Sequence, residues 1–557
     1  VCSSDLANLS DEYPVDRRIM LSRFRVWVVL EDFSQELNIG IQDAFRVGER
    51  NLARWDFTVP VGQGRVIKLD ITCRTALDAN AVELEFRRRP AIGNSRVLPD
   101  STPVRLIVRP DLDDRINHEL TKAYLGPERE FPRAIAINEQ RDGLVFAPAP
   151  DRRLILRMAG TEFRREEEWH YMVDFPLEEY YGLAHQGDLF SPGYFTGHLR
   201  GHASLTLTAA VNADAGQAEF PRPDRFPPQF GIMKAALTAL ECFVVRRNAY
   251  HTVIAGYPWF LDWGRDTLIA LRGLIAAGKL DIARDIIVQF AAFERQGTIP
   301  NMIRGLNDSN RDTSDAPLWL AVAIDDYLAA DGSEALLEFR IGNSKRSMLE
   351  VLKSIAENYR KGTPNGIRVD AETNLVFSPA HFTWMDTNYP AATPREGYPV
   401  EIQALWYRLL ALLGRYDRSF QPLAEQTARS IRELFVLPGL SRLSDCLHAA
   451  SGTGARRAVP DNALRPNQLF AITLGAVREP DLIRGIIRSC KTLVIPGAIR
   501  SLADAEVEPP LPVTLDGRRL NNPRRPYQGH YRGPEDTMRK VAYHNGTAWC
   551  WPFPSYA

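Results

Sequence analysis

The sequence predicts two structurally different parts, an N-terminal β-sandwich followed by an all-α domain. Short runs such as "RVIKLDI" (65–71) carry apolar residues at every second position, and Gly, Pro, Asp and Asn lie between the runs. Many short strands broken by turn residues are typical of a sandwich. Beyond residue 230 the apolar residues recur every three to four positions instead, which is the period of a helix that buries one face.

The predicted elements follow one another along the chain in this order. The strands are expected at 65–71, 81–89, 104–110, 152–158, 167–175 and 203–211. The helices are expected at 230–245, 267–278, 280–294, 316–330, 345–360, 400–414, 422–436, 467–475 and 480–491. Because many connections are short, neighbouring helices should pack as antiparallel hairpins.

A proline-rich segment divides the chain. The stretch "FPRPDRFPPQF" (220–230) contains four prolines and is predicted to be a linker. We therefore expect the β-sandwich domain at 7–219 and the helical domain at 231–557, while the first six residues fit neither part. A chain of 557 residues is long enough to bury more than one core.

The composition excludes several classes of partner. A net charge of −1 and a pI near 6.9 provide no basic surface for nucleic acid. No apolar run approaches the ~20 residues that cross a bilayer, so no membrane span is expected. The six cysteines are scattered without CxxC spacing, which favours reduced thiols in a cytoplasmic protein over disulfides or a zinc site. We expect no metal and no cofactor.

The first candidate site is "WFLDWGRD" (259–266), directly before an apolar helix. Flat aromatic faces beside Arg and Asp suit a sugar ring, because its C–H face stacks while its hydroxyls need donors and acceptors. The residues that supply these groups are Trp259, Trp263, Arg265 and Asp266. A structural alternative is equally open: Asp266 starts the helix, Arg265 is its ion partner and the tryptophans are core.

The next candidate segment is "NDSNRDTSDAPLWL" (307–320). Asp312 or Asp315 can cap the helix that begins near Pro317, and for either residue alone this structural interpretation is favoured.

A third segment contains "TWMD" (383–386), in which Asp386 follows Trp384 and Met385. A carboxyl group against apolar surface has a raised pKa, which is what a general acid needs. Glu396 and Glu401 come next, and Glu401 opens a strongly periodic helix, where a structural role in the first turn is equally plausible.

The last candidate segment, "YHNGTAW" (543–549), contains His544 and Trp549. A single histidine is more often a satisfied structural group than a catalyst. The preceding residues 503–540 are rich in Pro and Arg and have no periodicity, which is typical of a lid, a binding loop or disorder.

Taken together, these blocks resemble the amylo-α-1,6-glucosidase module of glycogen debranching enzymes of the bacterial and archaeal type. The matching blocks are "WGRDTLIALRGL", "IPNMI", "SDAPLWL", "TWMD", "TPREGYPVEIQALWY", "RPNQLFAI" and "YHNGTAW". They cover about 230–557, and the N-terminal half matches more loosely through "RRIMLSR" and "DLFSPGYF".

The resemblance implies a β-sandwich followed by a glucoamylase-like (α/α)6 toroid of six helical hairpins. It also implies an inverting glycoside hydrolase that removes the α-1,6-linked glucose left on a trimmed branch of glycogen or a related α-glucan. By this likeness Asp386 is the general acid, and the terminal glucose is held by Trp263, Arg265 and Asp266. Asp315 and Glu401 would line the pocket. The remaining substrate-binding residues implied are Trp259, Trp319, Trp384, His544 and Trp549.

The chain departs from the family at its end. The family's catalytic base is a Glu beyond the block that resembles "YHNGTAW", whereas this chain stops at Ala557. We therefore expect an incomplete toroid and no turnover by this chain alone. Two alternatives stay open. One is another exo-acting α-glucosidase of the same clan, glucoamylase-like or trehalase-like; the other is a non-catalytic carbohydrate-binding fragment.

Overall fold

The computed structural model forms two compact units, Val1–Glu241 and Cys242–Ala557. It describes residues 6–10, 14, 17–48, 52–76, 79–91, 96–117, 119–180, 182–213, 218–220, 231–257, 260–342 and 345–557. The linker predicted at 220–230 lies outside the described residues except for Phe220. Each unit is described below by itself.

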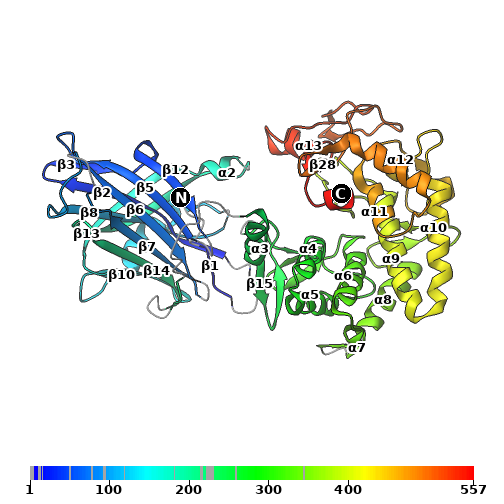
Figure 1. Ribbon diagram of the computed structural model, residues 1–557, viewed down its shortest axis with the longest axis horizontal. Helices are drawn as coiled ribbons and strands as arrows, with labels where there is room; N and C mark the ends of the chain where they lie inside the picture. Colours follow the sequence, from blue (N-terminus) through cyan, green and yellow to red (C-terminus); the bar gives the residue numbers. More distant parts are fainter. Residues whose placement is uncertain are drawn as a thin grey trace. The chain divides into compact units, whose positions relative to one another are not determined.

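The first unit consists of two antiparallel sheets (Figure 1). One sheet has the strand order β1-β2-β8-β13-β12, with β3 beside β2. Its strands are β1 (Leu6–Asn8), β2 (Arg17–Leu30), β3 (Phe33–Glu36), β8 (Val104–Ile116), β12 (Glu162–Asp174) and β13 (Gln186–Leu199). The other sheet has the order β4-β5-β6-β7-β14-β11-β10-β9. Its strands are β4 (Gln42–Val47), β5 (Leu52–Pro60), β6 (Val66–Thr75), β7 (Ala81–Arg88), β9 (Ile135–Ile137), β10 (Gly143–Ala149), β11 (Arg152–Met158) and β14 (Ser204–Val211).

A single buried cluster takes side chains from both sheets, for example Val108 of β8 and Leu69 of β6. Alternation explains this: along β8, Val104, Leu106 and Val108 are buried in the cluster while the residues between them face away from it. All six strands expected from the period-two pattern are present, so the sheet-rich N-terminal part is confirmed. Others were missed, including β13, whose Gly and Pro residues hide the pattern.

The second unit is mainly helical (Figure 1). Its helices are α4 (Gly264–Ala276), α5 (Leu280–Ala292), α6 (Ala316–Asp331), α7 (Ala335–Glu338), α8 (Met348–Lys361), α9 (Val400–Tyr416), α10 (Gln421–Phe435), α11 (Leu469–Thr473), α12 (Pro480–Cys490) and α13 (Lys540–Tyr543). The short strands between them form pairs and triplets, including β17 (Asp262–Trp263), β18 (Met302–Arg304) and β19 (Asn307–Asn310). Helix α3 (Ile232–Cys242) lies at the division between the units.

Helices α6 and α9 form the centre of this unit. Every residue of α6 from Ala316 to Asp325 is buried, and a helix that is covered on all sides belongs inside a domain. Helix α9 contacts both α6 and α10, and α6 contacts α4. The N-terminal ends of α4 and α6 are therefore held by a packed core. No helix in the described ranges is long and apolar enough to cross a membrane.

Candidate active site

A cavity of about 400 Å³ opens in the second unit where three of the four candidate segments meet. It is lined by Ala255, Phe260, Trp263, Arg265, Asp266, Ile269, Ala270, Trp384, Asp386, Tyr543, His544, Trp549 and Trp551. Seven residues expected at a site are among these: Trp263, Arg265, Asp266, Trp384, Asp386, His544 and Trp549. Trp259 lies outside the described residues.

The loop that carries the first block is held in place from three sides. Trp263 pairs with Met302 across the β17–β18 ladder, and the buried carboxylate of Asp262 accepts from Arg247 at 2.6 and 2.9 Å. Gly264 donates its N–H to the carbonyl of Asn301 at 2.9 Å. A Cβ at this glycine would lie 2.2 Å from the carbonyl oxygen of Pro300, so only glycine allows the close approach that starts α4 here.

The guanidinium of Arg265 is the centre of the charge network. It is 5 % exposed, and its Nε lies 2.9 and 2.7 Å from the two carboxylate oxygens of Asp315. Its Nη1 donates to Oδ2 of Asp386 at 2.9 Å. Two of its guanidinium nitrogens are bonded to carboxylates, which fixes the orientation of the group.

Asp386 is the half-buried carboxyl group of the cavity wall. Its side chain is 31 % exposed and follows Trp384, which is 5 % exposed. Loss of surrounding water raises the pKa of Asp386; Arg265 opposes the rise, and the charge of Asp315 adds to it. The net direction is upward, which keeps the proton on the carboxyl group to higher pH than is usual for aspartate.

Asp266 lies in the first turn of α4 and differs from Asp386 in exposure. Its side chain lines the cavity and is exposed, while Trp263 occupies the N-cap position without a side-chain capping bond. Partial desolvation and the charges of Asp386 and Asp315 raise its pKa, while Arg265 lowers it. An exposed carboxylate on a cavity wall is available to accept hydrogen bonds from a ligand's hydroxyl groups.

One wall of the cavity is aromatic. His544 stacks on Trp549 with ring centroids 5.4 Å apart, and Trp384 meets Trp549 and Trp551 edge-on at 5.4 and 5.0 Å. The indole N–H of Trp384 donates to Asn467 at 2.8 Å, which fixes the ring. Burial and the nearby arginines hold the pKa of His544 well below its usual range, so its imidazole is neutral.

Sequence reasoning did not select Tyr543, Trp551 or Phe260 for this wall. Tyr543 and Trp551 flank the selected pair His544 and Trp549, so the aromatic density of "YHNGTAWCW" was the available signal. Phe260 directly follows the predicted Trp259.

Three expected residues lie outside the cavity wall. Asp315 is 1 % exposed; it accepts from Arg265 and from Thr313 and makes no capping bond to α6. Trp319 is 2 % exposed and packs edge-on against Phe470.

Glu401, the third, is 2 % exposed and lies in a separate buried ion network. Arg395 donates to both of its carboxylate oxygens, and Nε of the same arginine donates to Asp445 at 2.7 Å. The resemblance implied that Asp315 and Glu401 line the pocket. In the structure neither residue lines the cavity, because Asp315 is paired with Arg265 and Glu401 is paired with Arg395.

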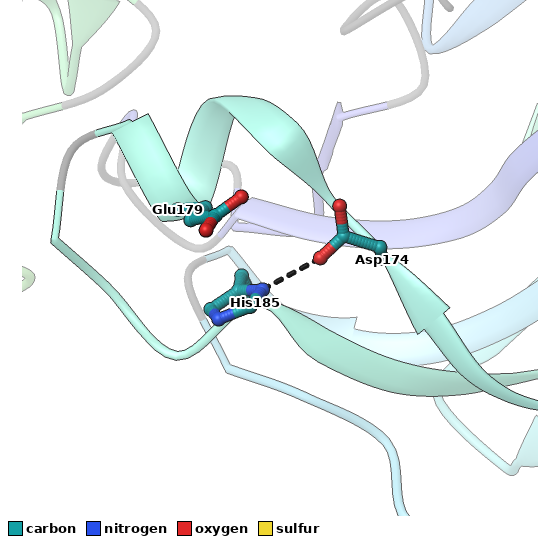
Figure 2. Close-up of side chains that lie close together, drawn as sticks. All are labelled: Asp174, Glu179 and His185. Carbon is teal, nitrogen blue, oxygen red and sulfur yellow. Dashed lines mark hydrogen bonds and ion pairs between the residues drawn. The ribbon is translucent and has the colours of Figure 1, made fainter.

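A group with metal-ligand chemistry lies in the first unit. Figure 2 shows Asp174, Glu179 and His185, whose ligand atoms lie within 4.8 Å of one another. Nδ1 of His185 is 2.6 Å from Asp174. Asp174 and Glu179 are exposed, and exposed groups of this kind are common without a metal, so we assign no ion to them. His198 and His202 have HxxxH spacing, but a strand ends at Leu199 between them, and Nε2 of His202 pairs with Asp100 at 3.2 Å.

Comparison with known proteins gives a consistent result for both units. Residues 238–557 match the family model described as amylo-alpha-1,6-glucosidase, and residues 6–206 match the one described as glycogen debranching enzyme N terminal. The glycogen debranching enzyme of Saccharomyces cerevisiae is 26% identical over 211 residues, which cover 28% of this chain and 14% of that protein. The match therefore spans a small part of the length of this relative.

Among solved structures, a bacterial glucoamylase complexed with acarbose aligns with a TM-score of 0.48 and 11% sequence identity. The alignment covers 86% of this chain and 74% of that one.

Proposed function

Because this chain belongs to the amylo-alpha-1,6-glucosidase family, we propose that its cavity binds the terminal glucose of an α-1,6 branch and serves its hydrolysis. The substrate would be glycogen or another branched α-glucan already trimmed to a short branch. The reaction would be an inverting glycoside hydrolysis, in which one carboxyl group protonates the leaving oxygen and another activates water.

One observation supports the assignment of the proton donor. Asp386 lines the cavity beside Trp384, accepts a hydrogen bond from Arg265, and has a raised pKa. A carboxyl group that keeps its proton to higher pH than an ordinary aspartate and reaches the cavity can donate it to a glycosidic oxygen. Arg265 would then stabilise the carboxylate that remains.

The second carboxylate of the wall, Asp266, would hold the sugar. It is exposed to the cavity, whereas Arg265, Asp315 and Glu401 are buried in ion pairs. We propose that Asp266 accepts hydrogen bonds from glucose hydroxyls while Trp263, Trp384 and Trp549 contact the C–H faces of the ring. Asp315 and Glu401 do not line the cavity and would act through position, whereas Arg265 lines it and would both hold Asp386 and reach the glucose.

The same proposal includes the finer architecture and the location. The two sheets with their shared core would be a β-sandwich domain at 7–219, and the helical unit a glucoamylase-like (α/α)6 arrangement within 231–557. Cys446 and Cys490 are buried thiols, which agrees with a cytoplasmic protein.

Glucose release from three substrates tests the function. In a longer protein that contains this chain and the family's catalytic base, we expect release from an α-1,6-branched limit dextrin and none from trehalose or linear maltose. Release from maltose would favour a glucoamylase-like enzyme, and release from trehalose a trehalase-like one. Calorimetric binding of the limit dextrin without release would favour a carbohydrate-binding role.

A further inference from the structure

We propose that the solvent-facing side of the sheet that contains β2, β8, β12 and β13 is a second saccharide-binding surface, which takes an unbranched run of an α-glucan. The surface is a hollow of about 590 Å³ in the first unit. Its lining residues, here called the sheet platform, are Arg25, Trp27, Val29, Glu31, Asp32, Ser34, Arg105, Ile107, Arg109, Glu166, Glu168 and Tyr194.

The strand register explains why these side chains share one face. Trp27 of β2 pairs with Ile107 of β8, and Arg25 pairs with Arg109. Since alternate residues of a strand face the same way, these positions all face away from the core, while Val26 and Val108 lie in it. Tyr194 comes from β13, on the other side of β8 from β2 (Figure 1).

Two aromatic rings stand on this face two strands apart, which is about 10 Å across a sheet. The guanidinium carbon of Arg25 lies 5.7 Å from the ring centroid of Trp27, and that of Arg109 lies 5.7 Å from the ring of Tyr194. These contacts fix the rings, so little side-chain entropy is lost when a ligand stacks on them. The two rings can contact different sugar units of one chain.

The polar groups around the rings include both donors and acceptors. Arg109 donates to Glu166 at 2.8 Å and also pairs with Glu168. Arg105, Glu31 and Asp32 make no ion pair or side-chain hydrogen bond with the described residues, and all three are exposed. Their donors and acceptors are available to a ligand at the rim of the hollow.

The platform carries similar numbers of positive and negative side chains, which favours a neutral ligand over a charged one. The platform holds three cations (Arg25, Arg105 and Arg109) and four anions (Glu31, Asp32, Glu166 and Glu168). A polyanion such as RNA would meet the four carboxylates, and a cation would meet the three guanidinium groups. A neutral chain of hydroxyl groups with apolar C–H faces fits the mixture of rings, donors and acceptors. The choice of an α-glucan among neutral saccharides rests on the proposed function.

The test uses β-cyclodextrin, a closed ring of α-1,4-linked glucose without a chain end. Such a ring cannot place a terminal glucose in the cavity of Asp386, so its binding reports on the platform alone. We expect calorimetry on the whole chain to detect binding, and the double variant Trp27→Ala/Tyr194→Ala to weaken it by about tenfold or more, as truncation of aromatic anchors does. Binding should change little from about 50 to about 500 mM salt, because the ligand is neutral.

Three controls keep the result specific. Tyr124→Ala removes an aromatic residue that is 76 % exposed and lies outside the platform, so it should bind as the wild type does. Asp266→Ala alters only the cavity and should also bind normally. Trp27→Phe keeps a ring and should retain most of the affinity, which separates loss of a contact from loss of folding.

The proposal is overturned by wild-type affinity in the folded double variant, by absence of binding to the wild type, or by equal loss in Asp266→Ala. A dimer in size-exclusion chromatography that Trp27→Ala dissociates would assign the hollow to a contact between copies instead. Failure of glucose release from limit dextrin would overturn the proposed function and leave cyclodextrin binding as a separate result.

Discussion

Arg265 joins Asp315 and Asp386: its Nε is 2.7 Å from the first carboxylate and its Nη1 is 2.9 Å from the second. Asp315 is fully enclosed, whereas Asp386 is partly open to the cavity. One guanidinium therefore neutralises a buried charge and at the same time fixes the carboxyl group that faces the ligand. This arrangement explains why an arginine lies at the start of α4.

Replacing Arg265 should destabilise the second unit. Arg265→Met leaves Asp315 buried without its cation, a loss of about 3–5 kcal/mol in the free energy of unfolding. Arg272→Met is the matched control, because Arg272 pairs with Asp326 at 2.6 Å near the surface and such pairs contribute about 0–1 kcal/mol. Thermal and urea unfolding measure both values; equal effects would contradict the central role of Arg265.

In a longer protein that contains this chain and the family's catalytic base, Asp386→Asn should lower the rate of glucose release from limit dextrin by about 10²–10⁴, the contribution of a positioned general acid. The loss should shrink with glucosyl fluoride, whose leaving group needs no proton. Asp312→Asn, three residues before Asp315 and outside the cavity wall, should leave the rate unchanged. An Asp386→Asn enzyme with normal activity on limit dextrin would exclude this residue as the donor.

The pH dependence follows from the raised pKa of Asp386. The protonated form donates, so activity should be lost as pH rises through the folded-state pKa, and this loss should occur above the usual range of aspartate. The sign for stability is the same: between the unfolded and the folded pKa the folded chain binds more protons, so stability falls as pH rises. A pH–rate profile whose alkaline limb persists in Asp386→Asn would contradict the assignment.

Asp266→Ala should weaken binding of 1-deoxynojirimycin by about 1–3 kcal/mol, because a buried hydroxyl of the bound ligand would lose its acceptor. The free energy of unfolding should fall little, by about 0.3–1 kcal/mol, since the side chain is exposed and supplies only a first-turn charge to α4. Calorimetry and thermal unfolding test the two parts, with Asp312→Ala as the control. Unchanged affinity would mean that Asp266 serves the helix and not the ligand.

Glu401→Gln should lower stability and spare binding. The substitution removes the charge that Arg395 meets with two hydrogen bonds, although Asp445 still accepts from the same arginine. We expect the free energy of unfolding to fall by about 3 kcal/mol, which is the low end of the range for a broken buried ion pair. Glu396→Gln, at a half-buried position on the same segment, should have little effect. A folded Glu401→Gln protein that has lost affinity for 1-deoxynojirimycin would place Glu401 at the ligand.

Local sequence pattern determined the two kinds of secondary structure and the segments that meet at the cavity. Period two predicted strands such as β11, and period 3.6 predicted helices such as α9, because the side of each element that must be buried is fixed by its own geometry. "TWMD" and "WGRD" were visible for a similar reason: polar groups among tryptophans are unusual within a short window. The periodicity of apolar residues and the composition of a short motif both depend only on residues that are close together in the sequence.

Tertiary structure alone decided which carboxylates are free to act. Arg265 meets Asp315 and Asp386 from 50 and 121 residues away, and Arg395 captures Glu401 and reaches Asp445 on a distant strand end. The sequence distinguished Asp386 by its apolar neighbours, but it could not show that Asp266 reaches the cavity while Asp315 and Glu401 do not. The four carboxylates differ in burial and in the nearest guanidinium, and both quantities depend on long-range packing, because the energy of a charge is set by the water and the counter-charge around it.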